Sequence, residues 1–256
     1  MTRSIAFTLL IVVLLLTACK KSSIEKVSSE IKGNVLLADE SGNFFNDNSG
    51  MTVIVENSNP LVSTITDPRG NFNLSIDHRL TTFTLIYIKP QIGTFKRSFT
   101  KDNMGLFFWD GNDKLKIDQD NEDLSEKSTV VINSFHASIV NDTLKISCNI
   151  SATDNDQKFI ELLSQKNLSN ISIGTIDQTR SNWTHKLPVK NGDNFFNFCM
   201  KCSSICNDWI SGDNIYLVAY GDSYYSNAYV DRTTNKTIMP NLNLNNPSTI
   251  VSVVVP

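Results

Sequence analysis

The sequence predicts an all-β protein, and three observations support this fold class. Asn, Ser, Thr, Val and Ile outnumber the helix formers Ala, Glu and Gln. Short stretches alternate between apolar and polar residues, as at Phe72, Leu74 and Ile76, which fall on one face of a strand. Clusters of turn residues separate these stretches. We expect two β-sandwich domains, at residues 30–125 and 126–256.

The beginning of the chain predicts export. Thr2 and Arg3 form a short, positively charged start, and an apolar run from Ile5 to Leu16 follows it. A run of about a dozen apolar residues has the length of a signal peptide and is too short for an ordinary membrane-spanning helix. We therefore assign residues 1–18 to a signal peptide.

A lipid attachment site follows the apolar run. The residues Leu16-Thr-Ala18-Cys19 resemble the lipobox of bacterial lipoproteins, in which a branched apolar residue and two small residues precede the cysteine. The resemblance implies cleavage between Ala18 and Cys19 and acylation of Cys19, with acyl chains such as palmitate as the membrane anchor. An ordinary secretory signal with a chance cysteine is the alternative. Residues 19–29 are polar and predict a flexible tether.

The residues after the cysteine bear on localisation. Surface-exported lipoproteins of Bacteroidetes often carry an acidic signal there, whereas this chain has Lys20 and Lys21. The resemblance therefore favours the outer membrane, with the protein facing the periplasm, over display on the cell surface. Surface exposure stays open as the alternative.

The first domain reads as a series of strands and turns. The expected strands are residues 31–37, 51–55, 63–66, 71–76, 82–88 and 93–99. Between the third and fourth strands, Asp67 to Gly70 forms a turn in which Pro68 presets φ and Gly70 supplies conformational freedom.

Five segments of this domain carry a resemblance to a known family. They are Gly33-Asn-Val, Ser49-Gly50-Met51-Thr-Val-Ile-Val, Thr64-Ile-Thr-Asp67-Pro-Arg-Gly70-Asn-Phe, Phe83-Thr-Leu and Gly93-Thr-Phe-Lys. They resemble the carboxypeptidase regulatory-like domain, a small transthyretin-like β-sandwich found in many exported Bacteroidetes proteins. The chain departs from that family at residues 80–84, where the usual glycine is missing.

An acidic stretch at residues 101–127 lies between the domains. Four of its carboxylates lie close together, those of Asp118, Asp120, Glu122 and Asp123. Such groups can converge on calcium, but the glycine and the bidentate glutamate of a calcium loop are absent at the required spacing. We expect a solvated linker, with calcium as the alternative.

The second domain again reads as strands. The expected strands are residues 130–132, 144–150, 171–176, 183–187, 195–199, 215–220 and 249–255. Residues 154–169 predict a short helix or an irregular strand crossing. The spacing favours an immunoglobulin or fibronectin III-like sandwich. The last forty or so residues resemble the tail of small flavobacterial lipoproteins with the same two-part layout, a resemblance that implies no activity.

The sequence argues against several function classes. A net charge of −3 without a basic stripe argues against a nucleic-acid partner. The three histidines, His78, His136 and His185, lack a glutamate three residues later, which a zinc carboxypeptidase needs. Motifs for a catalytic serine or a phosphate-binding loop are also absent. We expect no enzymatic activity, no catalytic residue, no metal and no cofactor.

Four cysteines remain after Cys19, at Cys148, Cys199, Cys202 and Cys206. An even number in an exported chain predicts structural disulfides with three alternative connectivities. Unpaired buried thiols, a zinc site with Cys148 or His185 as the fourth ligand, and a redox pair are the alternatives.

Two surface features complete the set of candidates. Five tyrosines could form a surface for sugar rings with Asp222 and Asp231 nearby: Tyr216, Tyr220, Tyr224, Tyr225 and Tyr229. We take Tyr224, Tyr225, Asp222 and Asp231 as the candidate ligand surface. The alternative is a structural role, with Tyr216 and Tyr220 in the sandwich core and Tyr224 and Tyr225 on a loop. Asp142-Thr143-Leu144 resembles a site at which Bacteroidetes O-glycosylate exported proteins, so Thr143 is a candidate acceptor. We expect a membrane-anchored binding or scaffolding module whose partner is an envelope protein or a glycan.

Overall fold

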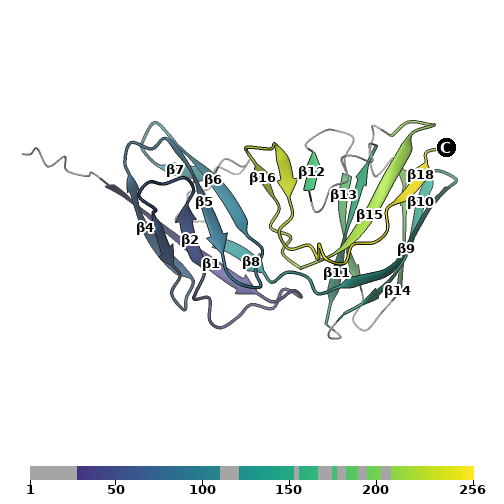
Figure 1. Ribbon diagram of the computed structural model, residues 1–256, viewed down its shortest axis with the longest axis horizontal. Helices are drawn as coiled ribbons and strands as arrows, with labels where there is room; N and C mark the ends of the chain where they lie inside the picture. The colour runs from purple at the N-terminus through teal and green to yellow at the C-terminus, as the bar shows by residue number, and fades with distance from the viewer. Residues whose placement is uncertain are drawn as a thin grey trace, which may run out of the picture.

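A computed structural model describes residues 28–109, 121–152, 156–166, 175–177, 183–189, 195–202 and 209–256. These residues form β-strands joined by turns and loops, so the all-β prediction is confirmed. They build a first and a second unit, which lie side by side (Figure 1). None of the described residues belongs to a helix with the length and apolar content that a membrane span needs.

The first unit consists of two sheets that enclose one core. One sheet has the order β4-β1-β8, from β4 (Asn71–Asp77), β1 (Ser28–Ala38) and β8 (Asn121–Ser125). The other has the order β3-β2-β5-β6-β7, from β3 (Ser63–Ile65), β2 (Thr52–Val55), β5 (Thr82–Ile88), β6 (Phe95–Lys101) and β7 (Phe107–Trp109). Fully buried side chains from both sheets, such as Leu37 and Phe99, share the core.

Strand β8 corrects the expectation of a solvated linker. It pairs in parallel with β1, from Asn34 opposite Asn121 to Ala38 opposite Ser125. Leu124 enters the core and is 1% exposed, and Glu122 on the same face is 4% exposed. The acidic composition concealed this strand, because alternation places one carboxylate inside the unit. Asp118 and Asp120 lie outside the described residues.

Three turns of the first unit share one chemical pattern, an aspartate followed three residues later by a glycine. In the turns that begin at Asp39, Asp67 and Asp102, the aspartate Oδ1 accepts hydrogen bonds from the backbone N–H groups two and four residues later. The glycines have φ values of +94°, +82° and +85°. Side chains with a Cβ rarely adopt this conformation, which explains why glycine occupies the position.

The second unit contains three sheets. The first has the order β14-β10-β9, from β14 (Phe195–Lys201), β10 (Thr143–Ser151) and β9 (Val131–Val140). The second has the order β13-β11-β15-β18, from β13 (Trp183–Val189), β11 (Lys158–Gln165), β15 (Asn214–Asp222) and β18 (Val251–Val254). The third, smaller sheet has the order β12-β17-β16, from β12 (Thr175–Asp177), β17 (Lys236–Ile238) and β16 (Tyr229–Asp231).

Strand β11 corrects the expectation of a helix or an irregular crossing. It is a regular strand between β13 and β15, and all eight residues are buried. One face contributes Ile160 and Leu162 to the main core, and the other contributes Leu163 to a smaller cluster. A strand covered on both faces shows no polar alternation, which explains why its sequence did not resemble a strand. The transthyretin-like and immunoglobulin-like domain types stay predictions.

A buried ion pair joins the two units. The Glu40 carboxylate of the first unit lies 2.7 Å from the Lys158 ammonium of the second, and the two side chains are 9% and 5% exposed. Glu40 also accepts hydrogen bonds from the Thr129 backbone N–H and hydroxyl at 2.6 and 2.8 Å. The carboxylate of the first unit is therefore satisfied by two residues of the second unit, Lys158 and Thr129.

Two glycines allow the units to approach closely. A Cβ on Gly42 would lie 2.5 Å from Cγ of Tyr224, and a Cβ on Gly93 would lie 2.4 Å from the carbonyl oxygen of Pro240. Both distances are shorter than any real carbon contact, so a side chain at either position would push the units apart. The units are therefore packed directly against each other.

Candidate functional site

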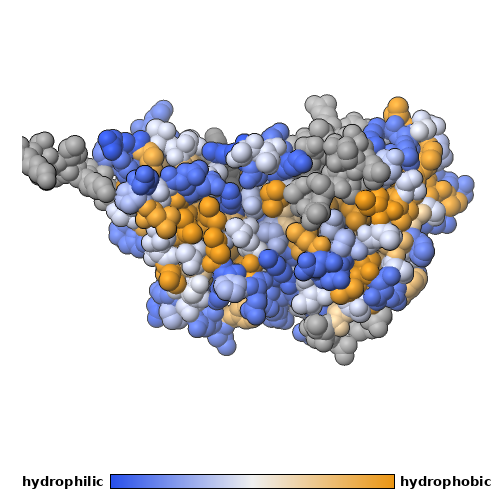
Figure 2. All heavy atoms as spheres, in the orientation of Figure 1, coloured by the Kyte–Doolittle hydropathy of each residue, from blue (hydrophilic) through white to orange (hydrophobic). Residues whose placement is uncertain are grey.

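A cleft of about 500 Å³ opens where the two units meet. Strand β6 supplies one wall, and strand β16 with its flanking loop supplies the other. The residues that line the cleft are Phe95, Lys96, Arg97, Ser98, Asn227, Ala228, Tyr229, Val230, Arg232 and Thr237. Figure 2 shows that hydrophobic and hydrophilic residues intermix over the visible face of the molecule, without one apolar patch that covers both units.

Strand β6 provides this wall, and among the described residues the first part of the strand is paired on one side. Phe95 to Ser98 pair with β5, whereas β7 pairs only with Phe99 to Lys101. Strand β16 pairs with β17 and is the edge of its own small sheet. Two strand edges therefore face each other across the cleft, with side chains rather than a backbone ladder between them.

An aromatic pair connects the walls. The rings of Phe95 and Tyr229 meet edge to face, with centroids 5.9 Å apart. Phe95 is 4% exposed and packs against Tyr87 in the core of the first unit, which fixes its ring. Tyr229 is half-buried, and burial raises the pKa of its phenol. Its hydroxyl therefore stays protonated at neutral pH and can both donate and accept a hydrogen bond.

Ion pairs bind the basic side chains of the β6 wall. The Lys96 ammonium lies 2.5 Å from the Glu56 carboxylate and 3.8 Å from that of Asp231. The hydrogen bond to Glu56 raises the pKa of Lys96. Arg97 Nε lies 2.7 Å from Glu122 Oε1, and its guanidinium carbon lies 5.5 Å from the centre of the Phe95 ring.

Burial governs the charge of Glu122. Its side chain is 5% exposed, and the loss of water raises its pKa to about 7. Arg97 opposes this shift because a nearby positive charge stabilises the carboxylate, but burial has the larger effect. The carboxyl group therefore changes protonation near neutral pH.

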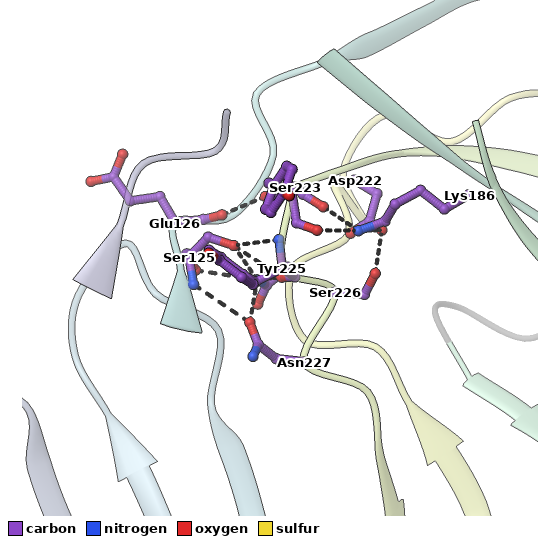
Figure 3. Close-up of polar contacts among 10 residues, drawn as sticks. Ser125, Glu126, Lys186, Asp222, Ser223, Tyr225, Ser226 and Asn227 are labelled. Atoms are coloured by element: carbon purple, nitrogen blue, oxygen red, sulfur yellow. Dashed lines mark hydrogen bonds and ion pairs between the residues drawn. The ribbon is translucent and has the colours of Figure 1, made fainter. Parts of the chain in front are cut away.

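Hydrogen bonds hold the loop that carries the second wall (Figure 3). Asn227 donates to the carbonyl oxygen of Asp123 at 2.6 Å. The Asn241 side-chain amide donates to the Tyr225 carbonyl oxygen at 2.6 Å and to Asn227 Oδ1 at 3.1 Å. The Ser125 hydroxyl donates to the Tyr225 carbonyl at 2.9 Å. The loop is thus attached to β8 of the first unit, and both walls of the cleft have a fixed relation to each other.

The predicted tyrosine and aspartate surface is divided in the structure. Tyr224 and Tyr225 lie together, with ring centroids 4.8 Å apart, and Phe44 of the first unit lies 5.6 Å from Tyr225. Asp222 is only 1% exposed and pairs with Lys186 at 3.1 Å (Figure 3). Asp231 lies near Lys96 at the cleft instead. Asp222 also accepts a hydrogen bond from the Ser226 hydroxyl, so it positions the loop that follows β15. Ligand binding by Tyr224 and Tyr225 stays a prediction.

The described cysteines are free thiols. Cys148 and Cys202 are buried and Cys199 is exposed. Cys148 on β10 lies opposite Phe196 on β14. Cys199 on β14 lies opposite Lys145, which is three residues before Cys148 on β10, and both Lys145 and Cys199 are exposed. Cys202 donates its N–H to the Asp142 carbonyl at the far end of β10. At about 3.3 Å per residue, this places Cys148 and Cys202 about 20 Å apart, well beyond disulfide reach.

No disulfide therefore joins any two of Cys148, Cys199 and Cys202. Cys206 lies outside the described residues. Buried unpaired thiols, one of the alternatives, match Cys148 and Cys202. Burial raises the pKa of Cys148 to about 12, which makes it unreactive. No group of three metal-binding side chains occurs within the described parts of the chain.

Two further candidates stay predictions. Thr143 begins β10 after a tight turn in which Asn141 and Asp142 have φ values of +51° and +57°, and it is half-buried. Ala18 and Cys19 lie outside the described residues, so the structure does not test the lipid anchor.

The cleft residues of β6 were missed by the sequence analysis. A signal existed, because Phe95, Arg97 and Phe99 alternate along one strand and this places an arginine on an apolar face. An arginine in that position needs a buried acid, and Glu122 supplies it. Tyr229 was one of the five tyrosines considered for sugar binding, but its approach to Phe95 had no local signal, because it depends on how the two units pack.

Comparisons with known proteins give only distant similarities. No protein-family model matches the chain, and no curated protein is similar to it in sequence. A DUF3823 family protein from Parabacteroides merdae aligns over 88% of this chain and 99% of its own, with 12% identity and a TM-score of 0.31.

Two further solved structures align comparably. A Bacteroides uniformis protein that is proposed to bind carbohydrate aligns over 88% of this chain and 98% of its own, with 9% identity and a TM-score of 0.29. A DUF3823 family protein from Bacteroides ovatus aligns over 90% and 100%, with 9% identity and a TM-score of 0.29. TM-scores this low carry no argument about the function of this chain.

Proposed function

We propose that this protein is a lipid-anchored binding module of the cell envelope that holds a glycan, without chemical turnover, in the cleft between its two units. The observation that carries the proposal is the composition of that cleft. It combines the half-buried Tyr229 ring, which the buried Phe95 supports from behind, with hydroxyl, amide and charged side chains from both units.

Each part of the cleft has a counterpart in the chemistry of a sugar. The C–H faces of a sugar ring are apolar and pack on aromatic side chains, whereas its hydroxyls need donors and acceptors. Ser98, Thr237 and the Tyr229 phenol offer hydroxyls. The volume of about 500 Å³ lies within the range of small-ligand sites.

The fixed junction supports a binding role. The buried Glu40–Lys158 pair and the Asn241 hydrogen bonds hold the two walls together before any ligand arrives. A preformed site loses less conformational entropy on binding, which improves the affinity for a ligand whose individual contacts are weak. A scaffolding role for an envelope protein does not require such a cleft.

The test is a glycan array probed with the mature soluble chain, residues 20–256, and confirmed by titration calorimetry on the retained glycans. We expect retention of at least one class of glycan and loss of at least tenfold in affinity for Tyr229→Ala. The matched control is the Tyr224→Ala, Tyr225→Ala double variant, which removes the other aromatic cluster. Thermal melting verifies that each variant is folded.

The outcomes separate the two sites. Loss of binding in Tyr229→Ala alone supports the cleft, and loss in the double variant alone transfers the glycan site to Tyr224 and Tyr225. If no glycan is retained, the proposed function is wrong. A pull-down from intact envelopes then tests the remaining alternative, an envelope protein as the partner.

A further inference from the structure

The charged groups around the cleft balance each other. Three basic side chains line it, Lys96, Arg97 and Arg232, and three acidic side chains, Glu56, Glu122 and Asp231, lie on or directly behind its walls. The two basic groups of β6 are both occupied by carboxylates. Lys96 contacts Glu56 and Asp231, and Arg97 contacts Glu122.

We propose that the cleft selects uncharged sugars over acidic sugars and that Glu122 sets this selectivity by neutralising Arg97. This inference rests on the proposed function and names the ligand class of the same site. Glu122 is a positioning residue, because it lies behind the wall and acts through Arg97.

The geometry explains the selectivity. An acidic sugar would have to bring its carboxylate close to Arg97, whose charge is already balanced by Glu122 at 2.7 Å. The incoming anion would lose part of its water and meet the Glu122 carboxylate directly behind the guanidinium, a combination that is unfavourable. A neutral hydroxyl has no such penalty and can hydrogen-bond to the guanidinium without separating the pair.

The burial of Glu122 makes it an effective determinant of specificity. The Glu56 and Asp231 side chains are 28% and 19% exposed, so solvent screens their charges more than that of Glu122, whose side chain is 5% exposed. The other ionisable groups that interact with Glu122 are Tyr87 on β5 and its neighbour Asp123 on β8. Neither lines the cleft, so a change in the charge of Glu122 reaches the ligand mainly through Arg97.

The pKa of Glu122, raised by burial to about 7, gives a test that needs no mutation. At pH 8.5 the carboxyl group is ionised, and at pH 5.5 it is mostly protonated and no longer neutralises Arg97. Uronic-acid carboxylates stay ionised at both pH values, because the pKa of an ordinary carboxyl group is about 4. None of the residues that line the cleft is a histidine, so Glu122 dominates its titration over this range.

The experiment compares each neutral glycan retained on the array with its uronic-acid counterpart, at pH 8.5 and 5.5. We expect the wild-type protein to prefer the neutral glycan at pH 8.5 and to gain about tenfold in relative affinity for the acidic glycan at pH 5.5. Glu122→Gln should show the higher relative affinity for the acidic glycan at both pH values. Glu30→Gln, which alters an exposed carboxylate outside the cleft, should behave like the wild type.

The failures of the two proposals are distinguishable. If neither glycan binds in any arm, the proposed function fails and this inference fails with it. If glycans bind but the ratio of acidic to neutral affinity is the same at both pH values, the inference alone is wrong. If Glu122→Gln does not fold, the pH comparison on the wild-type protein still decides.

Discussion

The buried pair between Glu40 and Lys158 predicts a large effect of replacing the lysine. In Lys158→Met the apolar part of the side chain is retained and the ammonium is removed, which leaves the Glu40 carboxylate buried. Removing one partner of a buried pair typically costs 3–5 kcal/mol, because the remaining charge cannot recover its water. Glu40 keeps its two hydrogen bonds from Thr129, so we expect the lower end, about 3 kcal/mol of unfolding free energy.

The assay is urea unfolding of the mature chain, followed by fluorescence and circular dichroism. Glu40 and Lys158 belong to different units, so the loss should also separate the unfolding transitions of the two units. In the double variant Glu40→Gln, Lys158→Met the uncompensated charge is gone, and we expect it to be more stable than the single variant.

The control for this prediction is Lys32→Met, which breaks the surface pair between Lys32 and Glu30. Those side chains are 65% and 56% exposed, and such pairs contribute about 1 kcal/mol or less. The reasoning is refuted if Lys158→Met is no more destabilising than Lys32→Met, or if the double variant is no more stable than Lys158→Met.

Three further measurements test other parts of the structure. The pKa of Glu122, raised from 4.5 to about 7, should lower the unfolding free energy as pH rises from 4.5 to 7, by about 3 kcal/mol, and Glu122→Gln should remove this slope in pH-dependent urea titrations. Gly42→Ala should lose at least about 1 kcal/mol more than Gly212→Ala in thermal unfolding, because both glycines have positive φ but only Gly42 has a ring against it. A thiol reagent at pH 8 should modify the exposed Cys199 in the folded protein and reach Cys148 only after unfolding; equal rates would contradict their placement.

Alternation along the chain was sufficient to predict those strands that have one buried and one exposed face. Strand β4 shows this clearly, because Phe72, Leu74 and Ile76 are buried and the residues between them are exposed. The same logic failed for β11, where both faces are covered and the pattern disappears. It also failed for β8, where a buried glutamate looks like part of an acidic loop.

The turn at Asp67 was predicted from its proline and glycine, and the structure shows two more turns of that kind without proline. Asp39 with Gly42 and Asp102 with Gly105 make the same hydrogen bonds from the aspartate Oδ1. An aspartate three residues before a glycine accompanies all three turns, a local signal that does not depend on proline.

The candidate site was mostly hidden from sequence reasoning because it forms between units. Asp231 was among the sequence candidates, and its role as a ligand residue stays a prediction. Its neighbour at the cleft, Lys96, is more than a hundred residues away in the chain. Local patterns report the periodicity of a single strand and contain little information on which loops meet after the units pack. The same limit applies to Phe44, which joins the predicted tyrosines only across the junction.

The direction of β1 relates the cleft to the predicted anchor. Strand β1 begins at Ser28, at the end of the first unit that lies away from the second, and runs to Ala38 near the junction (Figure 1). Its 11 residues span about 35 Å. A tether from an acylated Cys19 would therefore enter the molecule at the end opposite the cleft. This arrangement would keep the cleft clear of the membrane surface and open to a glycan, which a site beside the tether would not allow.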